Sequence, residues 1–400
     1  MTGTPVFLDN PVQNYAWGSK TAIQKLLGLK PDGHTPWAEL WMGSHPKSPS
    51  KVLVNGERIN LDEWAGNNAQ AVLGEHVAGA YNNTLPYLFK VLAAEQPLSI
   101  QAHPDSAQAA KGFERENRQG VPFDAPHRNY RDPRGKPELI CAIEPFGAMI
   151  GFRDPESIIE QLSFFCPNTM DRQIRALAGQ PDSRGIRQFF HDLLNLDEIH
   201  RRKILDEALK RSENFGGMEA AWIKKLHEFY PDDIGVLAPS FLNLVEIKPG
   251  KAVYLRPGVI HAYLYGTGIE IMANSDNVLR GGLTSKHIDA AELTNILRFD
   301  FKPPELLEPG KINSAEKQYI TEAKEFTLSV IETEPDTVYH GPEKHSTEIL
   351  FCLKGSALIG KRGGGQSLSV SRGGSVLVPA AAGRYEITGS AFFYKAGVPL

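Results

Sequence analysis

The stretch "LPYLFKVLAAEQPLSIQAHPD", residues 85–105, carries the strongest indication of the fold. Its first half is an apolar run with the length of a buried strand, and "LSIQAH" reads as a second strand whose side chains alternate between two faces. Gln101 and His103 then share one face with Ser99. The Pro-Asp pair that follows favours a turn. The sequence therefore predicts a strand that ends with an amide and an imidazole on the same side.

Length and charge narrow the class of protein. The chain has 400 residues, more than one ordinary core, so two or three packed units are expected. A hydrophobic content of 41%, with 37 glycines and 28 prolines, indicates a folded chain rich in turns. The formal net charge of −4 argues against nucleic acid as a partner, because such proteins usually carry a basic surface.

The expected compartment follows from the N-terminus and the cysteines. The first residues show no basic segment followed by an apolar core, and no apolar run approaches the roughly twenty residues that span a bilayer. The three cysteines, Cys141, Cys166 and Cys352, are odd in number and far apart. That pattern is typical of free thiols in a reducing compartment and not of a metal cluster. We therefore expect a cytoplasmic protein with no membrane partner.

The chain divides into three zones by its patterning. Residues 1–153 and 236–310 are dense in short β-like runs separated by turn residues, and residues 311–400 return to the same pattern. Between them, residues 154–235 carry apolar side chains at three-to-four spacing, which predicts helices. We expect a mainly β protein with a helical insertion: one β domain from 1–153 and 236–310, a helical domain, and a C-terminal β domain.

Local signals predict where individual helices begin and end. "DPESIIEQLSFF", residues 154–165, opens with an Asp-Pro pair that is typical of a helix start. The early segment "SKTAIQKLLG", residues 19–28, predicts a helix with Ser19 as its N-cap and Gly28 as its stop signal.

Two distant segments resemble each other and indicate an internal repeat. "KPGKAVYLRPGVIHAYL" and "SRGGSVLVPAAAGRYEI" share a glycine turn, a short apolar strand, a proline and another strand. Aligning Pro257 with Pro379 places His261 opposite Gly383. One copy then carries a possible metal ligand, and the other lacks it.

The polar residues among the predicted strands form a candidate metal site. Gln101 and His103 supply half of it. "GKPELICAI" supplies Glu138 at the start of an apolar strand, where a buried carboxylate needs compensation, and "LRPGVIHAYL" supplies His261 after a Pro-Gly turn. Nitrogen and oxygen ligands of this kind favour Zn²⁺, although two imidazoles and a carboxylate also suit Fe(II). Spacing alone leaves open that these are ordinary strand residues.

A second polar segment is "GIEIMANSDNVLRGGLTSKHID", residues 268–289. Its Arg280 and Lys286 are candidates for holding a phosphate or stabilising an oxyanion. The alternative from pattern alone is a surface loop with solvated charges.

Several stretches together resemble type I mannose-6-phosphate isomerase (phosphomannose isomerase), a family of the cupin superfamily. They follow the family's order over roughly the first three quarters of the chain. The matching stretches are "QNYAWGS" (13–19), "AELWMGSHPKS" (38–48), "LPYLFKVLAAEQPLSIQAHPD" (85–105), "KPEL" (136–139), "RPGVIHAY" (256–263) and "SDNVLRGGLTSKHID" (275–289).

The resemblance implies two cupin jelly-roll domains, the second without metal, and a helical insertion. It implies one Zn²⁺ per chain, held by Gln101, His103, Glu138 and His261. It further implies a monomeric enzyme that interconverts mannose 6-phosphate and fructose 6-phosphate through an enediolate, with a place in mannose and GDP-mannose metabolism. The alternatives are an Fe(II) cupin oxygenase and a metal-free cupin that binds sugars.

The resemblance also suggests roles for other residues. Arg280 is expected to stabilise the enediolate, because its guanidinium stays cationic. The proton carrier is left open among three side chains and a water on the metal, and three further residues are expected to bind the substrate's phosphate and hydroxyls. The candidate proton carriers are Asp276, Glu270 and Lys136, and the candidate substrate-binding residues are Lys90, Ser99 and Lys286.

Two departures from the family pattern limit what can be transferred. Some bacterial members have a histidine before the "KPE" lysine, where this chain has Gly135, so no acid-base role is expected there. "GLTSK" stands where many members have "GLTPK". The segment beyond residue 311 matches only loosely, and nothing catalytic is expected from it.

Overall fold

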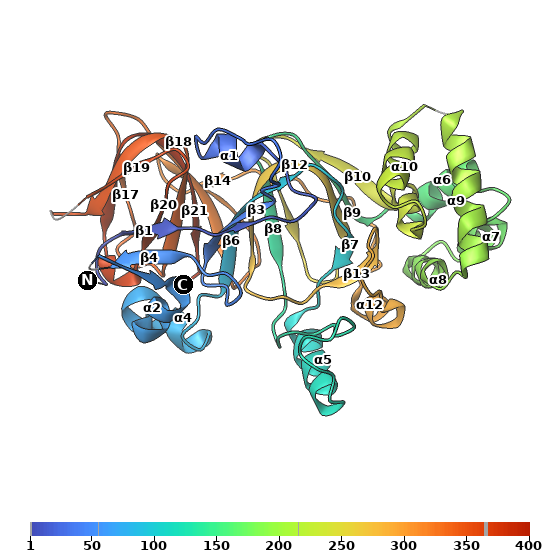
Figure 1. Cartoon of the computed structure of the whole chain (residues 1–400), viewed down its shortest axis with the longest axis horizontal. Coiled ribbons are helices and arrows are strands. Elements are labelled where there is room, and N and C mark those ends of the chain that lie inside the picture. Colours follow the sequence, from blue (N-terminus) through green and yellow to red (C-terminus); the bar gives the residue numbers. More distant parts are fainter. Residues whose placement is uncertain (1, 55, 215, 364–366) are drawn as a thin grey trace.

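The computed structural model describes residues 2–54, 56–214, 216–363 and 367–400. Two β bodies lie side by side, and a group of helices covers the far end of one of them (Figure 1). Both chain termini lie at the opposite end, beside the second β body. Over these residues no helix has the length and apolar content needed to cross a membrane.

Over the described residues, the first β body is a 10-stranded sheet whose main path runs β10-β9-β12-β6-β3-β2. Strands β7, β8, β11 and β13 lie outside this path. β7 and β8 pair with β12, β11 pairs with β8, and β13 pairs with β7, and together they complete the region around the candidate site. The strands are β2 (Val12–Gln13), β3 (Glu39–Gly43), β6 (Tyr87–Ala94), β7 (Ile100–Ala102), β8 (Glu138–Ala142), β9 (Phe146–Phe152), β10 (Leu242–Ile247), β11 (Ala252–Leu255), β12 (His261–Ala273) and β13 (Leu279–Gly282).

The second β body is an 11-stranded sheet over the described residues, with the path β14-β15-β16-β21-β18-β20-β1-β4-β5. Strand β17 pairs with β21, and strand β19 pairs with β18. The strands are β1 (Val6–Asp9), β4 (Lys51–Val54), β5 (Glu57–Asn60), β14 (Gly310–Lys311), β15 (Glu316–Tyr319), β16 (Thr327–Thr333), β17 (Val338–His340), β18 (Glu348–Lys361), β19 (Leu368–Ser371), β20 (Ser375–Val378) and β21 (Tyr385–Gly397).

Strand pairing differs from the expected division of the chain at its N-terminus. Strands β1, β4 and β5 come from the first 60 residues, yet β1 pairs with β20 of the C-terminal part, with Val6 opposite Leu377. They therefore extend the second sheet, although residues 1–153 were assigned to the first β domain. We keep the three-part division as a proposal, with these strands moved to the C-terminal unit.

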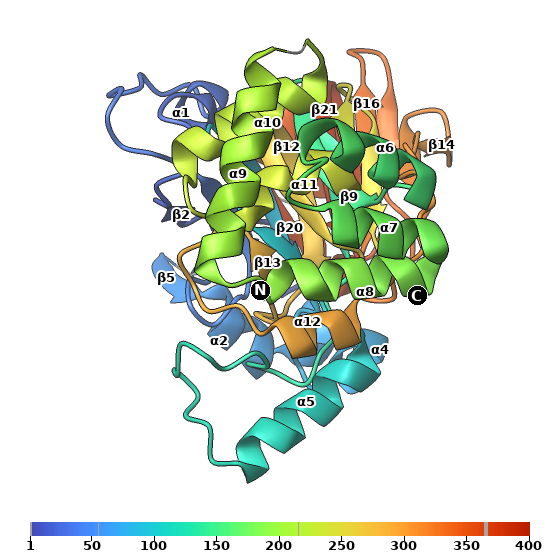
Figure 2. The ribbon, with the colours of Figure 1, turned by 90° about the vertical axis from the view of Figure 1, so that its right-hand side faces the viewer.

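The largest group of helices is the insertion. Helices α6 to α10 form the insertion that covers one end of the first β body, and Figure 2 shows them from that end. The helices are α1 (Ala22–Leu26), α2 (Leu61–Asn67), α3 (Ala69–Val72), α4 (Glu75–Ala80), α5 (Ser106–Arg118), α6 (Pro155–Phe165), α7 (Asp171–Gly179), α8 (Ser183–Leu194), α9 (Glu198–Glu213), α10 (Met218–Phe229), the 3₁₀ turn η1 (Ile234–Leu237), α11 (Ala238–Phe241), α12 (Ala290–Ile296) and the 3₁₀ turn η2 (Ala380–Ala382).

The helical insertion follows its predicted signals. α6 begins at Pro155, and the Asp154 carboxylate accepts a hydrogen bond from the amide of Ser157, as an N-cap does. Ile204 and Ala208 of α9 and Ile223 of α10 are buried in one apolar cluster with residues of β7, β9 and β12. The three-to-four spacing therefore buries one face of each helix against the first sheet.

Two local predictions are wrong in detail. The strand expected over residues 98–103 comprises only Ile100–Ala102, so Ser99 precedes it and His103 follows it. The proline after His103 lacks the amide that would continue a ladder. The early helix begins at Ala22 with Thr21 at the N-cap position. Ser19 lies outside this helix, although its hydroxyl accepts from the amides of Thr21 and Ala22.

The two β bodies share a continuous apolar core. Phe89, Leu139 and Ile271 of the first sheet belong to the same buried cluster as Phe351 and Tyr394 of the second. Burying such surfaces against each other is the main favourable term in folding, so the two bodies are expected to behave as one rigid unit. All three cysteines are buried free thiols, as predicted.

The register of the sheets supports the predicted repeat. In the first body Glu138 of β8 lies opposite Leu255 of β11, and in the second Glu348 of β18 lies opposite Val378 of β20. His261 begins β12, whereas Tyr385 begins β21. The expectation that the second copy binds no metal stays a prediction.

Candidate active site

Strand β7 brings three predicted site residues into one row. Gln101 lies opposite His261 of β12 on one side and opposite Arg280 of β13 on the other. Residues directly opposite each other in a sheet project from the same face. The candidate ligands Gln101 and His261 and the candidate catalytic Arg280 therefore meet on one face, although they lie up to 179 positions apart in the sequence.

His103, Glu138 and His261 form a candidate metal-binding group. Their ligand atoms all lie within 4.8 Å of one another. Nε2 of His103 is 3.3 Å from Oε1 of Glu138, and Nε2 of His261 is 3.4 Å from its Oε2. All three residues are at most 2% exposed. The structure thus joins the two imidazoles and the carboxylate that the sequence singled out.

Backbone contacts determine which imidazole nitrogens carry protons. His103 Nδ1 lies 2.7 Å from the Asn277 carbonyl oxygen, and His261 Nδ1 lies 3.0 Å from that of Val259. A carbonyl oxygen only accepts, so each Nδ1 donates and each Nε2 keeps its lone pair. Among the described residues, neither Nε2 nor Oε2 of Glu138 has a hydrogen-bond partner.

This arrangement fits a bound cation. Buried polar atoms without partners are rare and costly, and here three lone-pair atoms converge on one another. A divalent ion satisfies all of them at once, and two imidazole nitrogens with a carboxylate oxygen match Zn²⁺. Gln101 is partly buried and lies opposite His261 in the strand pairing.

Electrostatics keep His103 and Glu138 in the protonation states that metal binding requires. Burial lowers the pKa of His103 to about 4, so this imidazole is neutral near pH 7. Burial by itself would raise the pKa of Glu138, but His103 and Lys136 hold it well below its usual range. Nζ of Lys136 lies 3.0 Å from Oε1 of Glu138. Neutral imidazoles and an ionised carboxylate are the forms that bind metal.

A second buried charge group lies on the adjacent strands β3, β6 and β12. Nζ of Lys90 is 3.4 Å from Glu39 and 3.1 Å from Glu270, and the Tyr263 hydroxyl donates to Glu270 at 2.9 Å. Burial alone would lower the pKa of Lys90, but Glu39 and Glu270 raise it. Burial raises the pKa of Glu270. Lys90 is thus a fixed cation that neutralises two carboxylates.

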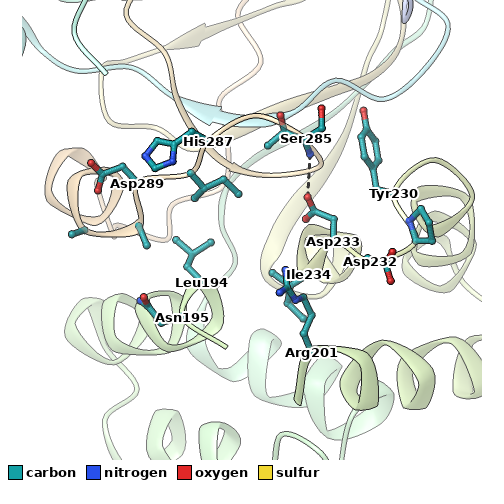
Figure 3. Close-up of a pocket in the computed structure, with 15 residues that line it drawn as sticks. Leu194, Asn195, Arg201, Tyr230, Asp232, Asp233, Ile234, Ser285, His287 and Asp289 are labelled. Carbon is teal, nitrogen blue, oxygen red and sulfur yellow. Dashed lines mark hydrogen bonds between the residues drawn. The ribbon is translucent and has the colours of Figure 1, made fainter. Parts of the chain in front are cut away.

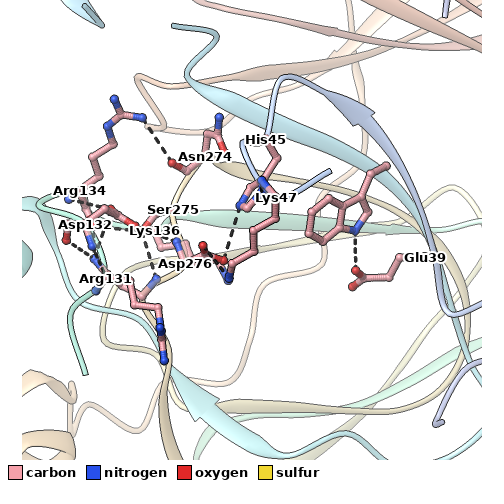
Figure 4. A network of polar contacts seen from close by, with 12 residues as sticks. Glu39, His45, Lys47, Arg131, Asp132, Arg134, Lys136, Asn274, Ser275 and Asp276 are labelled. Atoms are coloured by element: carbon pink, nitrogen blue, oxygen red, sulfur yellow. Dashed lines mark hydrogen bonds and ion pairs between the residues drawn. The ribbon is translucent and has the colours of Figure 1, made fainter. Parts of the chain in front are cut away.

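Asp276 belongs to a polar network beside the metal group (Figure 4). Its carboxylate lies 2.9 Å from Lys47 and 3.5 Å from His45. Burial would raise the pKa of Asp276, but His45 and Lys47 hold it well below its usual range. Asp276 also borders a pocket of about 470 Å³, whose lining includes Arg131 and Asp132.

Asn277 connects this network to the metal group. It is fully buried, and its carbonyl oxygen accepts the His103 proton. Its side-chain amide donates to the Asp132 carbonyl at 2.8 Å and accepts from the Arg131 amide at 2.7 Å. Asn277 thereby ties the loop that leads to Lys136 to the orientation of His103, a supporting role of the kind that outer residues play around metals.

Two cations beside the metal group lack partners. Among the described residues, the Arg280 guanidinium and the Lys286 ammonium make no hydrogen bond or ion pair. Burial and the nearby Arg131 lower the pKa of Arg280, and burial and Arg280 lower that of Lys286. Neighbouring cations that depress each other's pKa values attract an anion.

The remaining predicted site residues differ in how close they lie to this group. Lys136 contacts Glu138 directly, whereas Lys90 and Glu270 contact each other in the second buried group. Ser99 lies outside β7 and is partly buried. Sequence reasoning missed Asn277, Asp132 and Glu39, because their contacts join segments up to 174 positions apart. The stretch "SDNVLRGGLTSKHID" indicated the segment, but it gave no sign of the contact between Asn277 and His103.

The fold and the site together define a class of protein: a cupin-type β protein with a candidate mononuclear metal centre of imidazole and carboxylate ligands. Comparison with known proteins identifies the family within that class. The family model "Phosphomannose isomerase type I, catalytic domain" matches residues 6–155. The chain belongs to the type I mannose-6-phosphate isomerase family, as the sequence motifs indicated.

Relatives from distant organisms match nearly the whole chain. Mannose-6-phosphate isomerase of Salmonella typhimurium is 41% identical over 356 residues, which cover 88% of this chain and 90% of the relative. The human enzyme of the same name is 32% identical over 410 residues, covering 93% of each. A solved structure of the Salmonella typhimurium protein bound to fructose 6-phosphate and zinc has a TM-score of 0.92 and 38% identity, and the match covers 99% of this chain and 100% of that one.

Proposed function

We propose that this protein is a zinc-dependent isomerase that interconverts mannose 6-phosphate and fructose 6-phosphate. The observation that carries the proposal is the buried group of His103, Glu138 and His261, whose lone pairs converge and lack partners among the described residues. The Salmonella typhimurium relative bound to fructose 6-phosphate and zinc supports it. A contribution to mannose and GDP-mannose metabolism is a further part of the proposal.

The reaction requires a proton to leave carbon 2 of the open-chain aldose and return at carbon 1. The negative charge of the enediolate must be stabilised on the two sugar oxygens. When bound, a zinc ion supplies Lewis-acid stabilisation of that charge. We assign its ligands to Gln101, His103, Glu138 and His261, of which the last three contact one another in the structure.

Arg280 is proposed to stabilise the developing charge. It lies beside Gln101 across the β7–β13 pair and has no competing partner among the described residues. Its fork of N–H donors addresses two oxygens at once, and it remains cationic despite partial burial. Lys286 follows on the exposed loop after β13, where its ammonium can reach a phosphate group.

The surroundings of each candidate proton carrier support a choice among them. Asp276 is a poor base near neutral pH because His45 and Lys47 hold its pKa well below the usual range. Both oxygens of Glu270 accept hydrogen bonds, one from Lys90 and one from Tyr263. We propose Lys136, because its Nζ lies 3.0 Å from Oε1 of Glu138 and so at the edge of the candidate metal-binding group.

Metal removal tests the proposed function. Dialysis of the purified protein against a chelator should abolish isomerisation of mannose 6-phosphate, and Zn²⁺ should restore it. His261→Ala should lose bound zinc and activity together, whereas His287→Ala, an exposed imidazole outside the metal group, should keep both. The measurements are metal content by mass spectrometry and a coupled isomerase assay. Full activity in protein shown to be free of metal would contradict the proposal, as would iron with oxygenase activity.

A further inference from the structure

The loop that follows Arg280 is open on one side. Residues 283–289 connect β13 to α12, and the segment from Ser285 to His287 is exposed. A pocket of about 830 Å³ separates this loop from the helical insertion, with Leu194, Arg201 and Tyr230 on its far wall (Figure 3). Thr284, Ser285 and His287 of the loop line this pocket.

Asp233 of the insertion reaches the loop at its first turn. Its Oδ2 accepts a hydrogen bond from the Thr284 amide at 3.0 Å (Figure 3). Its Oδ1 accepts from the Gly235 amide at 2.7 Å. One carboxylate therefore holds the start of the loop and the start of η1 together. A carboxylate that accepts from backbone amides makes hydrogen bonds stronger than neutral ones.

The two segments also approach closely through glycines. A Cβ atom on Gly235 would lie 2.9 Å from the Leu283 amide nitrogen, and one on Gly282 would lie 3.1 Å from Oδ1 of Asp233. Only residues without a side chain allow this approach. The end of β13 is thus clamped directly against the turn that contains Asp233.

Leu283 shows why the clamp matters. Its φ of +51° lies in the left-handed region, which residues other than glycine seldom adopt, and its side chain is buried. Such a conformation persists only where its surroundings enforce it. The hydrogen bond from the Thr284 amide to Asp233, one residue later, helps to hold Leu283 in this conformation. The conformation of Leu283 determines the path of the chain between Arg280 and Lys286.

We propose that Asp233 is a positioning residue for the anion-binding pair Arg280 and Lys286. It holds the loop in the conformation that brings both cations to the substrate, without touching the substrate itself. This inference rests on the proposed function, in which these two cations bind the sugar phosphate.

The test compares Asp233→Ala and Asp233→Asn with a matched control, Asp182→Ala. The exposed Asp182 also accepts from two backbone amides, those of Arg184 and Gly185, but these lie within its own helix. Asp233→Ala should raise KM for mannose 6-phosphate and weaken inhibition by inorganic phosphate by roughly five- to tenfold, the effect of losing one such hydrogen bond. Asp233→Asn keeps one acceptor oxygen, so its KM and its inhibition by phosphate should lie between those of Asp233→Ala and the wild-type protein. Asp182→Ala should leave KM unchanged, and zinc content should be unchanged in all three.

A second readout does not depend on isomerase activity. Asp233→Ala should accelerate tryptic cleavage after Lys286 in the folded protein, and Asp182→Ala should not. An unaltered KM, phosphate inhibition and cleavage rate in Asp233→Ala would overturn the inference, even if its melting temperature fell. If the wild-type protein proved inactive on mannose 6-phosphate, the proposed function would fail, while the cleavage comparison would still report on the clamp.

Discussion

The chemistry of the site depends on a single proton position in each imidazole. His103 and His261 both direct Nδ1 at a backbone carbonyl, so both Nε2 lone pairs face Glu138. A free imidazole exchanges its proton between the two nitrogens, so the ring by itself does not fix this tautomer. The carbonyl oxygens of Asn277 and Val259 fix the tautomer by accepting the Nδ1 protons, so these two backbone atoms support the candidate metal site.

Substitution of Arg280 distinguishes charge stabilisation from phosphate binding. If its guanidinium stabilises the enediolate, Arg280→Lys should lower kcat with little change in KM, because the interaction strengthens in the transition state. Loss of one preorganised oxyanion donor typically lowers the rate about 10²–10³-fold, so an effect of that size is expected. Lysine keeps the charge but lacks the planar fork.

The measurement is steady-state kinetics on Arg280→Lys and Arg280→Ala, with zinc content determined in each. Lys286→Ala serves as the comparison, since it should raise KM more than it lowers kcat. A large rise in KM at unchanged kcat for Arg280→Lys would assign this residue to the phosphate and leave the oxyanion role unfilled.

At the scale of elements, helix α5 is connected to the site through the turn that follows His103. It begins directly after the His103-Pro104-Asp105 turn, and a capping box between Asp105 and Gln108 holds its first turn. Gly135 packs against that turn: a Cβ atom there would lie 2.7 Å from the Ser106 amide nitrogen. The helix start and the segment carrying Lys136 are therefore in backbone contact.

Gly135→Ala should disturb both the helix start and Lys136. The clash is with backbone atoms, which cannot rotate away, so we expect a loss of about 1–3 kcal/mol in unfolding free energy, as is usual for overpacking. Because Lys136 follows at once, kcat should also fall while bound zinc is retained. Thermal denaturation and steady-state kinetics provide the measurements.

Gly79→Ala is the matched control for this prediction. Gly79 lies exposed in α4, and an added Cβ meets no atom within 4 Å. Alanine there should stabilise the protein by about 0.5–1 kcal/mol, because it restricts the unfolded chain and favours the helix. Equal stability of the two variants would show that Gly135 does not pack as described.

On the scale of the whole molecule, the two β bodies carry matched polar positions in their interiors. Glu270 of β12 lies opposite Ile140 of β8, and Lys395 of β21 lies opposite Leu350 of β18. Where the first body buries a carboxylate, the second therefore buries an ammonium. Its Nζ lies 2.8 Å from Glu316 and 2.9 Å from Glu348.

Lys395→Met tests this internal charge balance. It would leave two buried carboxylates without their cation, and breaking a buried pair in this way typically costs about 3–5 kcal/mol. Burial alone would raise the pKa of Glu348, but Lys395 and His345 lower it. A lowered folded pKa gives stability that is present above the ordinary glutamate pKa of about 4.3 and is lost as the pH falls below it.

The loss of unfolding free energy caused by Lys395→Met should therefore be largest near pH 7 and become smaller towards pH 4. Without the lysine, burial favours the protonated carboxyl, and acid supplies the missing proton. Chemical denaturation of both proteins at pH 7.5, 6 and 4.5 measures the difference. Lys317→Met, on the exposed face of β15, should show no such trend. A deficit that did not vary with pH would mean that the carboxylates are not the source of the instability.

Much of the architecture could be predicted because its signals are local. The alternation and apolar runs indicated β6, β8 and β12, and the Asp-Pro pair and three-to-four spacing indicated α6 to α10. Both kinds of signal reflect geometry within one element, which the neighbouring residues determine. Recurring motifs likewise indicated His103, Glu138 and His261 before their contacts were known.

Only the tertiary structure decided how these pieces meet. The pairing of β1 with β20, the Asn277 carbonyl that orients His103, and the Asp233 contact to Thr284 each join segments far apart in the sequence. No local period or cap encodes such contacts. They depend on which strands become neighbours and on which buried polar atoms must then find partners. The sequence by itself determined the elements and the candidate ligands, and long-range packing determined the protonation, the charge balance and the orientation of the site.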